Sequence, residues 1–322
     1  MKTIFVVNPM AGKKNNVEKL IEKIKSDAEK LEADVEVYKT KSVGDATEFV
    51  KDFCNKYGKA RFIACGGDGT LNEVLCGAVG CEGTEVGVFP MGTGNDFVKN
   101  FDGNFDDVVA QITSCTEKCD VIKYTAELED GSKKVSYCAN MFNIGFDCNV
   151  CDAMNDIKKK TIFSGPLAYF LGIFIMLVKK KGANLKIELD GKTVHNGKLL
   201  LTSIANGCFC GGGVKSNPGA CVRDGIMNVN VVNNVSRTRF VSLLPYYMKG
   251  THLGVKGVEK VITCHDCKTI KITPLDGNMR LCIDGEIISA GITEFEILRD
   301  AFNFVVPHSH DVAKTEIEKL NA

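Results

Sequence analysis

The sequence predicts an α/β plus β fold, with an N-terminal three-layer α/β domain built on a parallel sheet and a C-terminal β-rich sandwich domain. Over the first 95 residues, short apolar runs alternate with segments of helical spacing, which is typical of strands separated by helices. From about residue 121 most segments read as strands. Asp-Gly pairs at 130–131, 190–191, 276–277 and 284–285 supply turns between them.

The N-terminal domain is expected to begin as alternating strands and helices. The strands fall at 4–7, 35–38, 62–64 and 86–89, and the helices at 17–31, 46–57 and 71–78. Helices of this length between strands make a parallel sheet, and such sheets bind ligands outside the carboxyl ends of their strands. The turns at Asn8, Gly66 and Pro90 all leave from those ends. We therefore expect these turns to converge on one crevice.

The second half of the chain is expected to be a sandwich or barrel of antiparallel strands. Its strands are predicted at 121–128, 135–143, 185–189, 199–205, 227–232, 269–273, 279–283 and 294–298. One helical interruption, at 166–178, is apolar almost all round and has lysine triplets on both sides. As a helix it would rise about 20 Å, too short to cross the roughly 30 Å hydrocarbon layer. It is either a core helix, which we favour, or a segment that docks in the membrane interface.

The composition describes an ordinary globular chain of 322 residues, 44% apolar and 25% charged, with a formal net charge of zero. No overall basic field favours a nucleic acid partner. Its 15 cysteines are scattered and no signal peptide precedes them, which favours a reducing cytoplasm. Cys264 and Cys267 have CxxC spacing, but no second pair lies at a zinc-site distance, so buried thiols are the default interpretation.

The stretch from Cys65 to Thr70 carries the strongest chemical signal. Glycines at 66, 67 and 69 remove Cβ atoms where a strand turns into a helix, so backbone N–H groups can approach a phosphate. A carboxylate within such a loop would repel phosphate, so Asp68 is interpreted as a residue on the Mg²⁺ side. Thr70 either caps the helix or offers its hydroxyl to the same phosphate. The alternative is a tight strand–helix turn with a capping Asp.

A second glycine loop follows the fourth strand, at 90–97 (PMGTGNDF). Neither this loop nor residues 8–13 (NPMAGK) is a Walker A motif, and no Rossmann GxGxxG is present. Any phosphate chemistry therefore belongs to another class of protein.

These motifs resemble those of the diacylglycerol kinase catalytic family, in particular the small bacterial lipid kinases. The blocks are residues 8–13, 66–74 (GGDGTLNEV), 90–97, 143–147 (NIGFD), 206–207, 211–213, 218–220, 224–225 and 284–286 (DGE). Residues 298–307 resemble the family's closing strand. The resemblance implies a nucleotide-binding domain at 1–120, to which 299–322 returns, and a lipid-substrate and magnesium domain at 121–298.

The resemblance also implies roles for individual residues. The nucleotide site would comprise Asn8, Gly12, Lys13, Thr40, Gly66, Gly67, Asp68, Gly69, Thr70, Asn72, Thr93, Asn95 and Asp96. Asp68 would hold the catalytic Mg²⁺ with Asp96. A structural Mg²⁺ would be held by Asp224 and by carbonyls near Cys221 and Ile226, with Asp120 as the other carboxylate of its network. The base would be Asp284 first and Glu286 second, against the alternative of an Asp-Gly hairpin turn with a solvated Glu.

The function that the resemblance implies is a cytoplasmic lipid kinase, peripheral at the inner face of the membrane. It would use ATP and Mg²⁺ to phosphorylate a lipid with a free hydroxyl, diacylglycerol being the leading acceptor and phosphatidic acid the product. A sphingoid base, phosphatidylglycerol or an isoprenoid alcohol presents a similar hydroxyl. An NAD kinase is the nearest rival enzyme, and a non-catalytic nucleotide or lipid sensor is the rival from a different class. A homodimer is possible, and no nucleic acid is expected.

Overall fold

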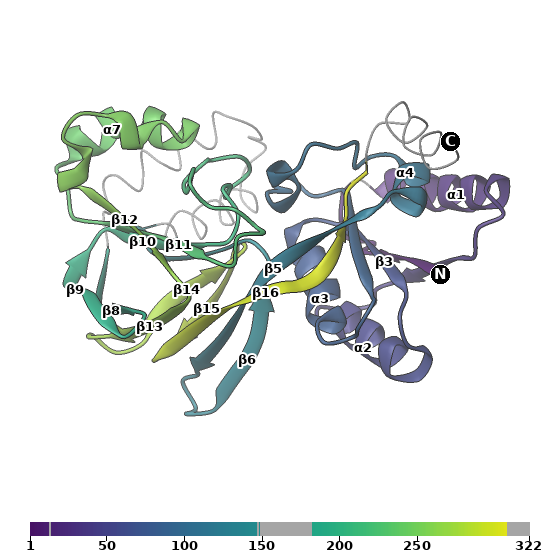
Figure 1. Ribbon diagram of the computed structural model, residues 1–322, viewed down its shortest axis with the longest axis horizontal. Helices are drawn as coiled ribbons and strands as arrows, with labels where there is room; N and C mark the ends of the chain where they lie inside the picture. Colours follow the sequence, from purple (N-terminus) through teal and green to yellow (C-terminus); the bar gives the residue numbers. More distant parts are fainter. Residues whose placement is uncertain (13, 147, 149–181, 308–322) are drawn as a thin grey trace. The chain divides into compact units, whose positions relative to one another are not determined.

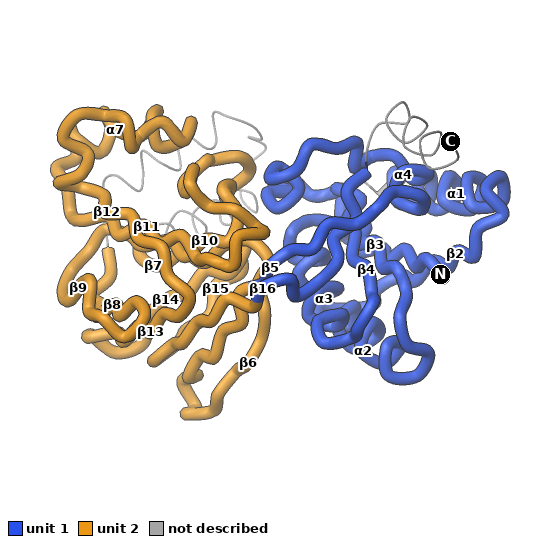
Figure 2. The backbone as a smooth tube through the Cα atoms, in the orientation of Figure 1, with its two compact units in different colours: residues 1–121, 299–322 blue, residues 122–298 orange. Residues whose placement is uncertain are grey.

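The computed structural model describes residues 1–12, 14–146, 148 and 182–307 (Figure 1). Lys13, Asp147 and the predicted apolar helix 166–178 lie outside the described residues. The chain divides into two compact units, Met1–Val121 with Arg299–Ala322, and Ile122–Leu298 (Figure 2). The assignment of one unit to the nucleotide and the other to lipid and magnesium stays a prediction.

The first unit is built on parallel strands in the order β2, β1, β3, β4. Their bounds are β1 Thr3–Val7, β2 Val35–Lys39, β3 Arg61–Gly66 and β4 Glu85–Pro90. The end of β16 (Thr293–Val305) also pairs with β4 in parallel, with Asn303 opposite Glu85. The closing strand of the chain thus joins the N-terminal sheet.

Helices cover both faces of this sheet (Figure 1). On one face lie α1 (Lys14–Lys30) and α4 (Val108–Thr113), and on the other lie α2 (Asp45–Tyr57) and α3 (Asp68–Ala78). Val17, Leu20 and Ile24 recur at helical spacing along α1 and pack on the buried side chains of β1 and β3. The predicted three-layer α/β architecture is confirmed. Leu31, the last residue of the predicted apolar face, lies just beyond α1, and Glu32 after it has a positive φ of 50°.

The second unit is a sandwich of two sheets, as predicted. One sheet contains β5 (Thr116–Glu127), β6 (Lys133–Cys138), β8 (Ala183–Leu189), β9 (Lys192–Leu199), β13 (Thr269–Pro274) and the first half of β16. The other, termed sheet B, has the order β12 (Ile262–Cys267), β11 (Met227–Val232), β10 (Leu201–Ala205), β7 (Met141–Gly145), β14 (Met279–Ile283) and β15 (Glu286–Ala290). Aliphatic side chains of both sheets form one core.

Two strands predicted as single runs are wrong, because each run changes sheet. Residues 135–143 form β6, which pairs with β5, and β7, which pairs with β10 and β14. The break falls at Asn140, whose carbonyl accepts N–H groups from Asn206 and Gly207. Residues 199–205 likewise divide at Leu200 between β9 and β10. Each half of both runs contributes a side chain to the shared core: Cys138 and Phe142 in the first run, and Leu199 and Ile204 in the second.

The Cys264–Cys267 pair lies on strand β12, which was not predicted from the sequence. Residues three apart on a strand point to opposite faces, and here Cys267 is in the core while Cys264 is exposed. The two thiols therefore do not converge. Within the described part of the chain, no group of three or more His, Cys, Asp or Glu side chains is arranged to hold a metal ion.

Candidate active site

The three predicted turns of the first unit meet at the carboxyl edge of its sheet. The N–H of Asn8 donates to the carbonyl of Cys65 at 3.0 Å, and the N–H of Met91 donates to that of Gly66 at 2.8 Å. Thr40 follows β2 and donates its N–H to the carbonyl of Val7 at 2.9 Å. Backbone hydrogen bonds thus hold the ends of β1, β2, β3 and β4 in one edge.

Glycine is required where the loops after β3 and β4 touch. A Cβ on Gly92 would lie 2.6 Å from the Cα of Gly67, and a Cβ on Gly66 would overlap the side chain of Thr70. Gly67 is the N-cap of α3 and makes no side-chain cap, so the first N–H groups of this helix are left to other partners. A helix N-terminus approached by bare backbone is suited to bind a phosphate.

Thr70 does not cap α3, so that half of its prediction is wrong. Its side chain is buried, and its Oγ accepts a hydrogen bond of 3.2 Å from Nδ2 of Asn8. The cap position falls three residues earlier, at Gly67. Oδ1 of Asn8 in turn accepts the N–H of Met10 at 2.9 Å, so Asn8 connects the first loop to α3. A role for the Thr70 hydroxyl toward phosphate stays a prediction.

The contact between Gly67 and Gly92 leads to a prediction. A Gly92→Ala substitution must push the two loops apart, because the added methyl meets the backbone of Gly67 at 2.6 Å as well as Oδ1 of Asn95 at 2.9 Å. We expect ATP affinity to fall about tenfold or more, measured as KM for ATP, with secondary structure unchanged. Gly254→Ala is the matched control, since a Cβ there meets nothing within 4 Å. An unchanged KM in Gly92→Ala would contradict the phosphate-binding role of this edge.

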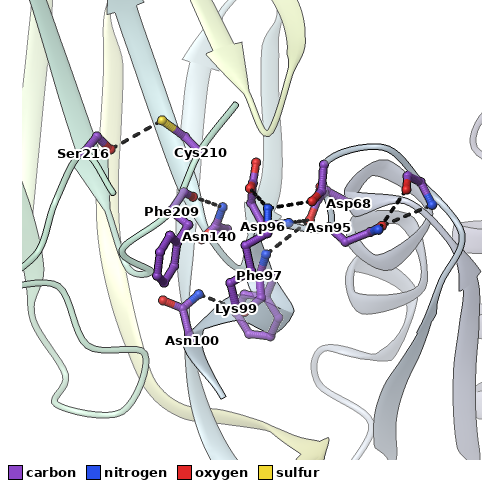
Figure 3. Close-up of polar contacts among 12 residues, drawn as sticks. Asp68, Asn95, Asp96, Phe97, Lys99, Asn100, Asn140, Phe209, Cys210 and Ser216 are labelled. Atoms are coloured by element: carbon purple, nitrogen blue, oxygen red, sulfur yellow. Dashed lines mark hydrogen bonds and ion pairs between the residues drawn. The ribbon is translucent and has the colours of Figure 1, made fainter. Parts of the chain in front are cut away.

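Two carboxylates and an ammonium group gather beside this glycine edge. Oδ1 of Asp68 accepts the N–H groups of Asp96 at 2.7 Å and of Phe97 at 3.2 Å (Figure 3). Oδ1 of Asp96, a buried residue, accepts from Nζ of Lys99 at 2.7 Å. Lys99 was not among the residues predicted from the sequence; its position three residues after Asp96, in the turn η1 (Phe97–Asn100), was the available signal.

The electrostatics of the Asp68–Asp96 pair suit a divalent cation. Burial, and next the charge of Asp96, raise the pKa of the Asp68 carboxyl above its ordinary value, while hydrogen bonds from Phe97 and Asp96 oppose the rise. The other oxygens of both carboxylates lie beside Gly94, whose Cβ would be 2.9 Å from Asp68 Oδ2 and 3.5 Å from Asp96 Oδ2. Paired carboxylate oxygens that repel each other are ligands that Mg²⁺ accepts. The residues therefore fit the predicted ion.

The remaining predicted nucleotide residues differ in their environment. Asn95 is at φ 50° and is engaged with Gly92, donating from Nδ2 to its carbonyl at 2.8 Å and accepting its N–H at 3.2 Å. It therefore shapes the loop. Asn72 has a buried Oδ1 that accepts no hydrogen bond from the described residues. Gly12, at φ 70°, lies against Met91, while Thr93 is exposed.

In the second unit, Asp284 and Gly285 form the two-residue turn between β14 and β15. Their φ values of 45° and 96° fit a type I′ turn, so the hairpin alternative describes the backbone correctly. The carboxylate, however, turns back onto the sheet. Oδ1 accepts the N–H of Met141 at 3.1 Å, and Oδ2 lies 3.1 Å from the Cys138 thiol, which donates.

Cys138 keeps its proton in this arrangement. Burial, and next the charge of Asp284, raise its pKa well above the ordinary value of a thiol. Asp284 is thus a half-buried carboxylate held by one N–H and one S–H donor. Glu286 begins β15 opposite Ile283 and is exposed. Asp284 therefore faces the sheet, whereas Glu286 is exposed to solvent.

The residues predicted for a second magnesium site lie in different units. Asp224 is exposed and accepts the N–H of Ile226 at 3.0 Å, in the same loop as the exposed Cys221. Asp120 is fully buried in the first unit, where its Oδ1 accepts the N–H of Asp300 at 2.8 Å. A carboxylate with neighbouring backbone carbonyls is a donor set that Mg²⁺ accepts, and the assignment stays a prediction.

Comparison with known proteins connects these motifs to described families. A model described as the diacylglycerol kinase catalytic domain matches residues 2–124, and one described as the YegS C-terminal NAD kinase beta sandwich-like domain matches residues 140–306. The chain is 26% identical to a diacylglycerol kinase of Staphylococcus carnosus (strain TM300) over 97% of each protein. It is 30% identical to a diacylglycerol kinase of Staphylococcus epidermidis over 88% of this chain and 84% of the relative.

A solved structure shares the fold. The crystal structure of a diacylglycerol kinase from Bacillus anthracis str. Sterne aligns with a TM-score of 0.66 at 20% identity, over 95% of this chain and 96% of that one. As for membrane contact, none of the helices within the described residues has the length and apolar character needed to traverse a bilayer.

Proposed function

Because this chain belongs to the diacylglycerol kinase catalytic family, whose members are ATP-dependent lipid kinases, we propose that its acceptor is diacylglycerol and its product phosphatidic acid. Both curated relatives compared above are named diacylglycerol kinase. The observation that carries the proposal is the Asp68–Asp96 pair beside the uncapped N-terminus of α3. A cation site next to a phosphate site is what phosphoryl transfer from ATP needs.

The first unit would bind and orient ATP. The N–H groups at the start of α3 and the glycine backbone of residues 66–69 and 92–94 would cradle the phosphates, while Asn8 and Asn95 hold the loops in place. Asp68 and Asp96 would hold Mg²⁺, and Lys99 would keep the Asp96 carboxylate in position. Bound Mg²⁺ neutralises charge that develops on the phosphate oxygens during transfer.

Asp284 would act on the acceptor. Its carboxylate would accept the proton of the lipid hydroxyl while that oxygen forms a bond to the γ-phosphorus of ATP. The bond from the γ-phosphorus to the β–γ bridging oxygen breaks, and ADP leaves with that electron pair. The hydrogen bonds from Met141 and Cys138 orient the carboxylate for this step.

Other acceptors are weighed by the same chemistry. A sphingoid base, phosphatidylglycerol or an isoprenoid alcohol would offer a similar hydroxyl, and apolar pockets discriminate weakly among such lipids. The matched C-terminal domain family is described as NAD kinase-like, so fold alone does not separate the chain from an NAD kinase. The match of residues 2–124 to the diacylglycerol kinase catalytic domain favours the lipid.

Transfer of labelled γ-phosphate from ATP and Mg²⁺ to a panel of acceptors tests the proposal. The panel contains diacylglycerol, sphingosine, phosphatidylglycerol and undecaprenol in mixed micelles, and NAD in solution. We expect labelled phosphatidic acid, and label formed at least about a hundredfold more slowly after Asp284→Asn. Label on another lipid would identify that lipid as the acceptor in place of diacylglycerol. Label on NAD would indicate an NAD kinase, and ATP binding without any label would favour a non-catalytic sensor.

A further inference from the structure

Two thiols of the first unit meet at one buried hydroxyl group. Cys54 lies in the last turn of α2, and Cys81 lies in the turn that connects α3 to β4. We propose that a peroxide oxidises this pair to a reversible disulfide, which fastens the end of α2 to the turn after α3. The inference goes beyond the proposed function and does not depend on it.

The side chain of Thr84 brings the two sulfur atoms together. Its Oγ donates to Sγ of Cys81 at 3.0 Å and lies 3.8 Å from Sγ of Cys54. Thr84 has one hydroxyl proton, which is directed at Cys81, so the Cys54 thiol is the donor in the second contact. The two thiols are also within hydrogen-bonding reach of each other. The pair is therefore in contact while both cysteines are reduced.

The two thiols differ in how easily they react. Burial, and next the hydrogen bond to Cys81, raise the pKa of the Cys54 thiol to about 12, while the contact with Thr84 opposes the rise. Cys54 therefore keeps its proton. Cys81 instead accepts the hydroxyl proton of Thr84, a contact that a thiolate sulfur also makes. Because the thiolate is the nucleophilic form, Cys81 should react with the oxidant first.

The oxidation has two steps, which balance with one molecule of hydrogen peroxide. In the first, the Cys81 thiolate attacks one peroxide oxygen and the O–O bond breaks. The products are a sulfenic acid on Cys81 and a hydroxide, which takes a proton and leaves as water. In the second, the Cys54 sulfur attacks the sulfenic sulfur to form the S–S bond. The hydroxide that leaves takes the Cys54 proton, so the peroxide is reduced to two waters.

The turn that carries Cys81 has room to close on Cys54. An S–S bond is about 2.05 Å long, so the two sulfur atoms must approach each other. Cys81 lies between Gly80 and Gly83, which have φ values of 90° and 74°. A Cβ on Gly80 would meet nothing within 4 Å. The adjustment can therefore be made within the turn, ahead of strand β4, which begins at Glu85.

The disulfide would close a covalent loop around the proposed phosphate site. Residues 54–81 include β3, the glycine loop at 66–70 and the whole of α3. Helices α2 and α3 already touch, since Oγ of Thr47 donates to the carbonyl of Glu73 at 2.9 Å. A bond near the C-terminal ends of both helices adds a covalent tie to this packing. Because it also restricts the unfolded chain, the bond should stabilise the fold.

Peptide mapping of the oxidised protein tests the bond directly. The full-length protein is treated with one equivalent of hydrogen peroxide, its remaining thiols are blocked, and it is digested with trypsin. We expect a linked pair of peptides, 52–56 and 62–99, that dithiothreitol separates. The larger peptide also holds Cys65 and Cys76, so fragmentation must place the bond at Cys81. A map in which Cys54 stays a free thiol, or is bonded to another cysteine, would overturn the inference.

Single variants separate the two steps. In Cys54→Ser the second thiol is missing, so Cys81 should remain a sulfenic acid, which dimedone labels. In Cys81→Ser we expect dimedone to label Cys54 at least about tenfold more slowly, because that thiol keeps its proton. The matched control is Cys76→Ser, which alters a half-buried thiol of the same tryptic peptide and should form the bond as wild type. Equal or faster labelling of Cys54 would contradict the order of the steps.

Calorimetry tests the effect of the bond on the fold. We expect the Tm of the oxidised wild type to rise by at least about 5 °C, and to return to its starting value after dithiothreitol. Dithiothreitol does not reduce methionine sulfoxide, so this reversal assigns the shift to the disulfide. Cys54→Ser should show no rise. A mapped disulfide that leaves the Tm unchanged would overturn the tie between α2 and the turn after α3.

Discussion

Replacing Asp68 with asparagine is expected to lower phosphoryl transfer about a thousandfold or more. The substitution removes one of two carboxylates that converge beside Gly94, and with it most of the site's attraction for Mg²⁺. A bound metal contributes several kcal/mol to stabilising the transition state, and each step of about 1.4 kcal/mol corresponds to a factor of ten in rate. We expect the Mg²⁺ concentration for half-maximal rate to rise as well. Steady-state kinetics over a range of Mg²⁺ concentrations measure both effects.

The matched control for this variant is Asp107→Asn. Asp107 also accepts two backbone N–H groups, those of Val109 and Ala110, but at the start of α4. If hydrogen bonding to backbone were the whole role of Asp68, the two variants would behave alike. We expect Asp107→Asn to retain activity. Near wild-type turnover in Asp68→Asn would remove Asp68 from the cation site.

The Asp68→Asn variant should not destabilise the protein without Mg²⁺ at neutral pH. The folded state holds the Asp68 proton more tightly than the unfolded chain, because its pKa is raised. This carboxyl therefore favours folding at low pH, and that contribution is lost as pH rises through the folded-state pKa. At neutral pH the ionised group is a cost that asparagine removes, while its amide oxygen can still accept from Asp96 and Phe97. We expect an equal or higher Tm by calorimetry.

The regular periods and the glycine-rich loop after β3 explain why so much of the first unit could be predicted from the sequence. Helical and strand periods in residues 1–95 are long and regular, and the motif at 66–70 lies at the end of a strand where sterics allow little but glycine. In the second unit, periodicity identified most strands, missed β9, β12 and β15, and did not show to which sheet each strand belongs. Each of the runs 135–143 and 199–205 places core side chains in both sheets, so its apolar residues do not mark Asn140 or Leu200 as the break.

The site was predictable in its residue types but not in its contacts. Asp68 and Asp96 follow from motifs, whereas the Lys99 ion pair and the engagement of Asn95 with Gly92 depend on local turns that spacing alone does not specify. For Asp284, sequence offered both a base and a hairpin turn as alternatives. The structure shows a turn whose carboxylate is held by Met141 and Cys138, two residues far away in the sequence.

The second large effect is expected for Asp284→Asn, which should lower kcat roughly 10²- to 10⁴-fold, the usual contribution of a general base. Asparagine accepts a positive φ, so the type I′ turn at 284–285 should persist. Its amide oxygen can still accept the N–H of Met141. The loss should therefore fall on proton transfer, with KM for ATP and the Tm nearly unchanged. Single-turnover kinetics with the lipid acceptor measure this step.

Asp190→Asn provides the matched control for Asp284→Asn. Asp190 occupies the same kind of Asp-Gly turn, at φ 46°, between β8 and β9. Desolvation alone would raise the pKa of its carboxyl, but hydrogen bonds from Thr269 and Lys268 lower it below its ordinary value. Its ionised form thus stabilises the fold above the unfolded-state pKa, and this is lost as pH falls through the folded-state pKa.

The two variants should therefore fail in opposite ways. Asp190→Asn removes an ionised acceptor from the N–H groups of Lys268 and Thr269, so it should lower the Tm slightly at neutral pH and leave turnover intact. Asp284→Asn should leave the Tm intact and abolish most turnover. If both variants lose only stability, Asp284 is a turn residue like Asp190, and the proton acceptor must be sought at Glu286, which is exposed beside the same turn.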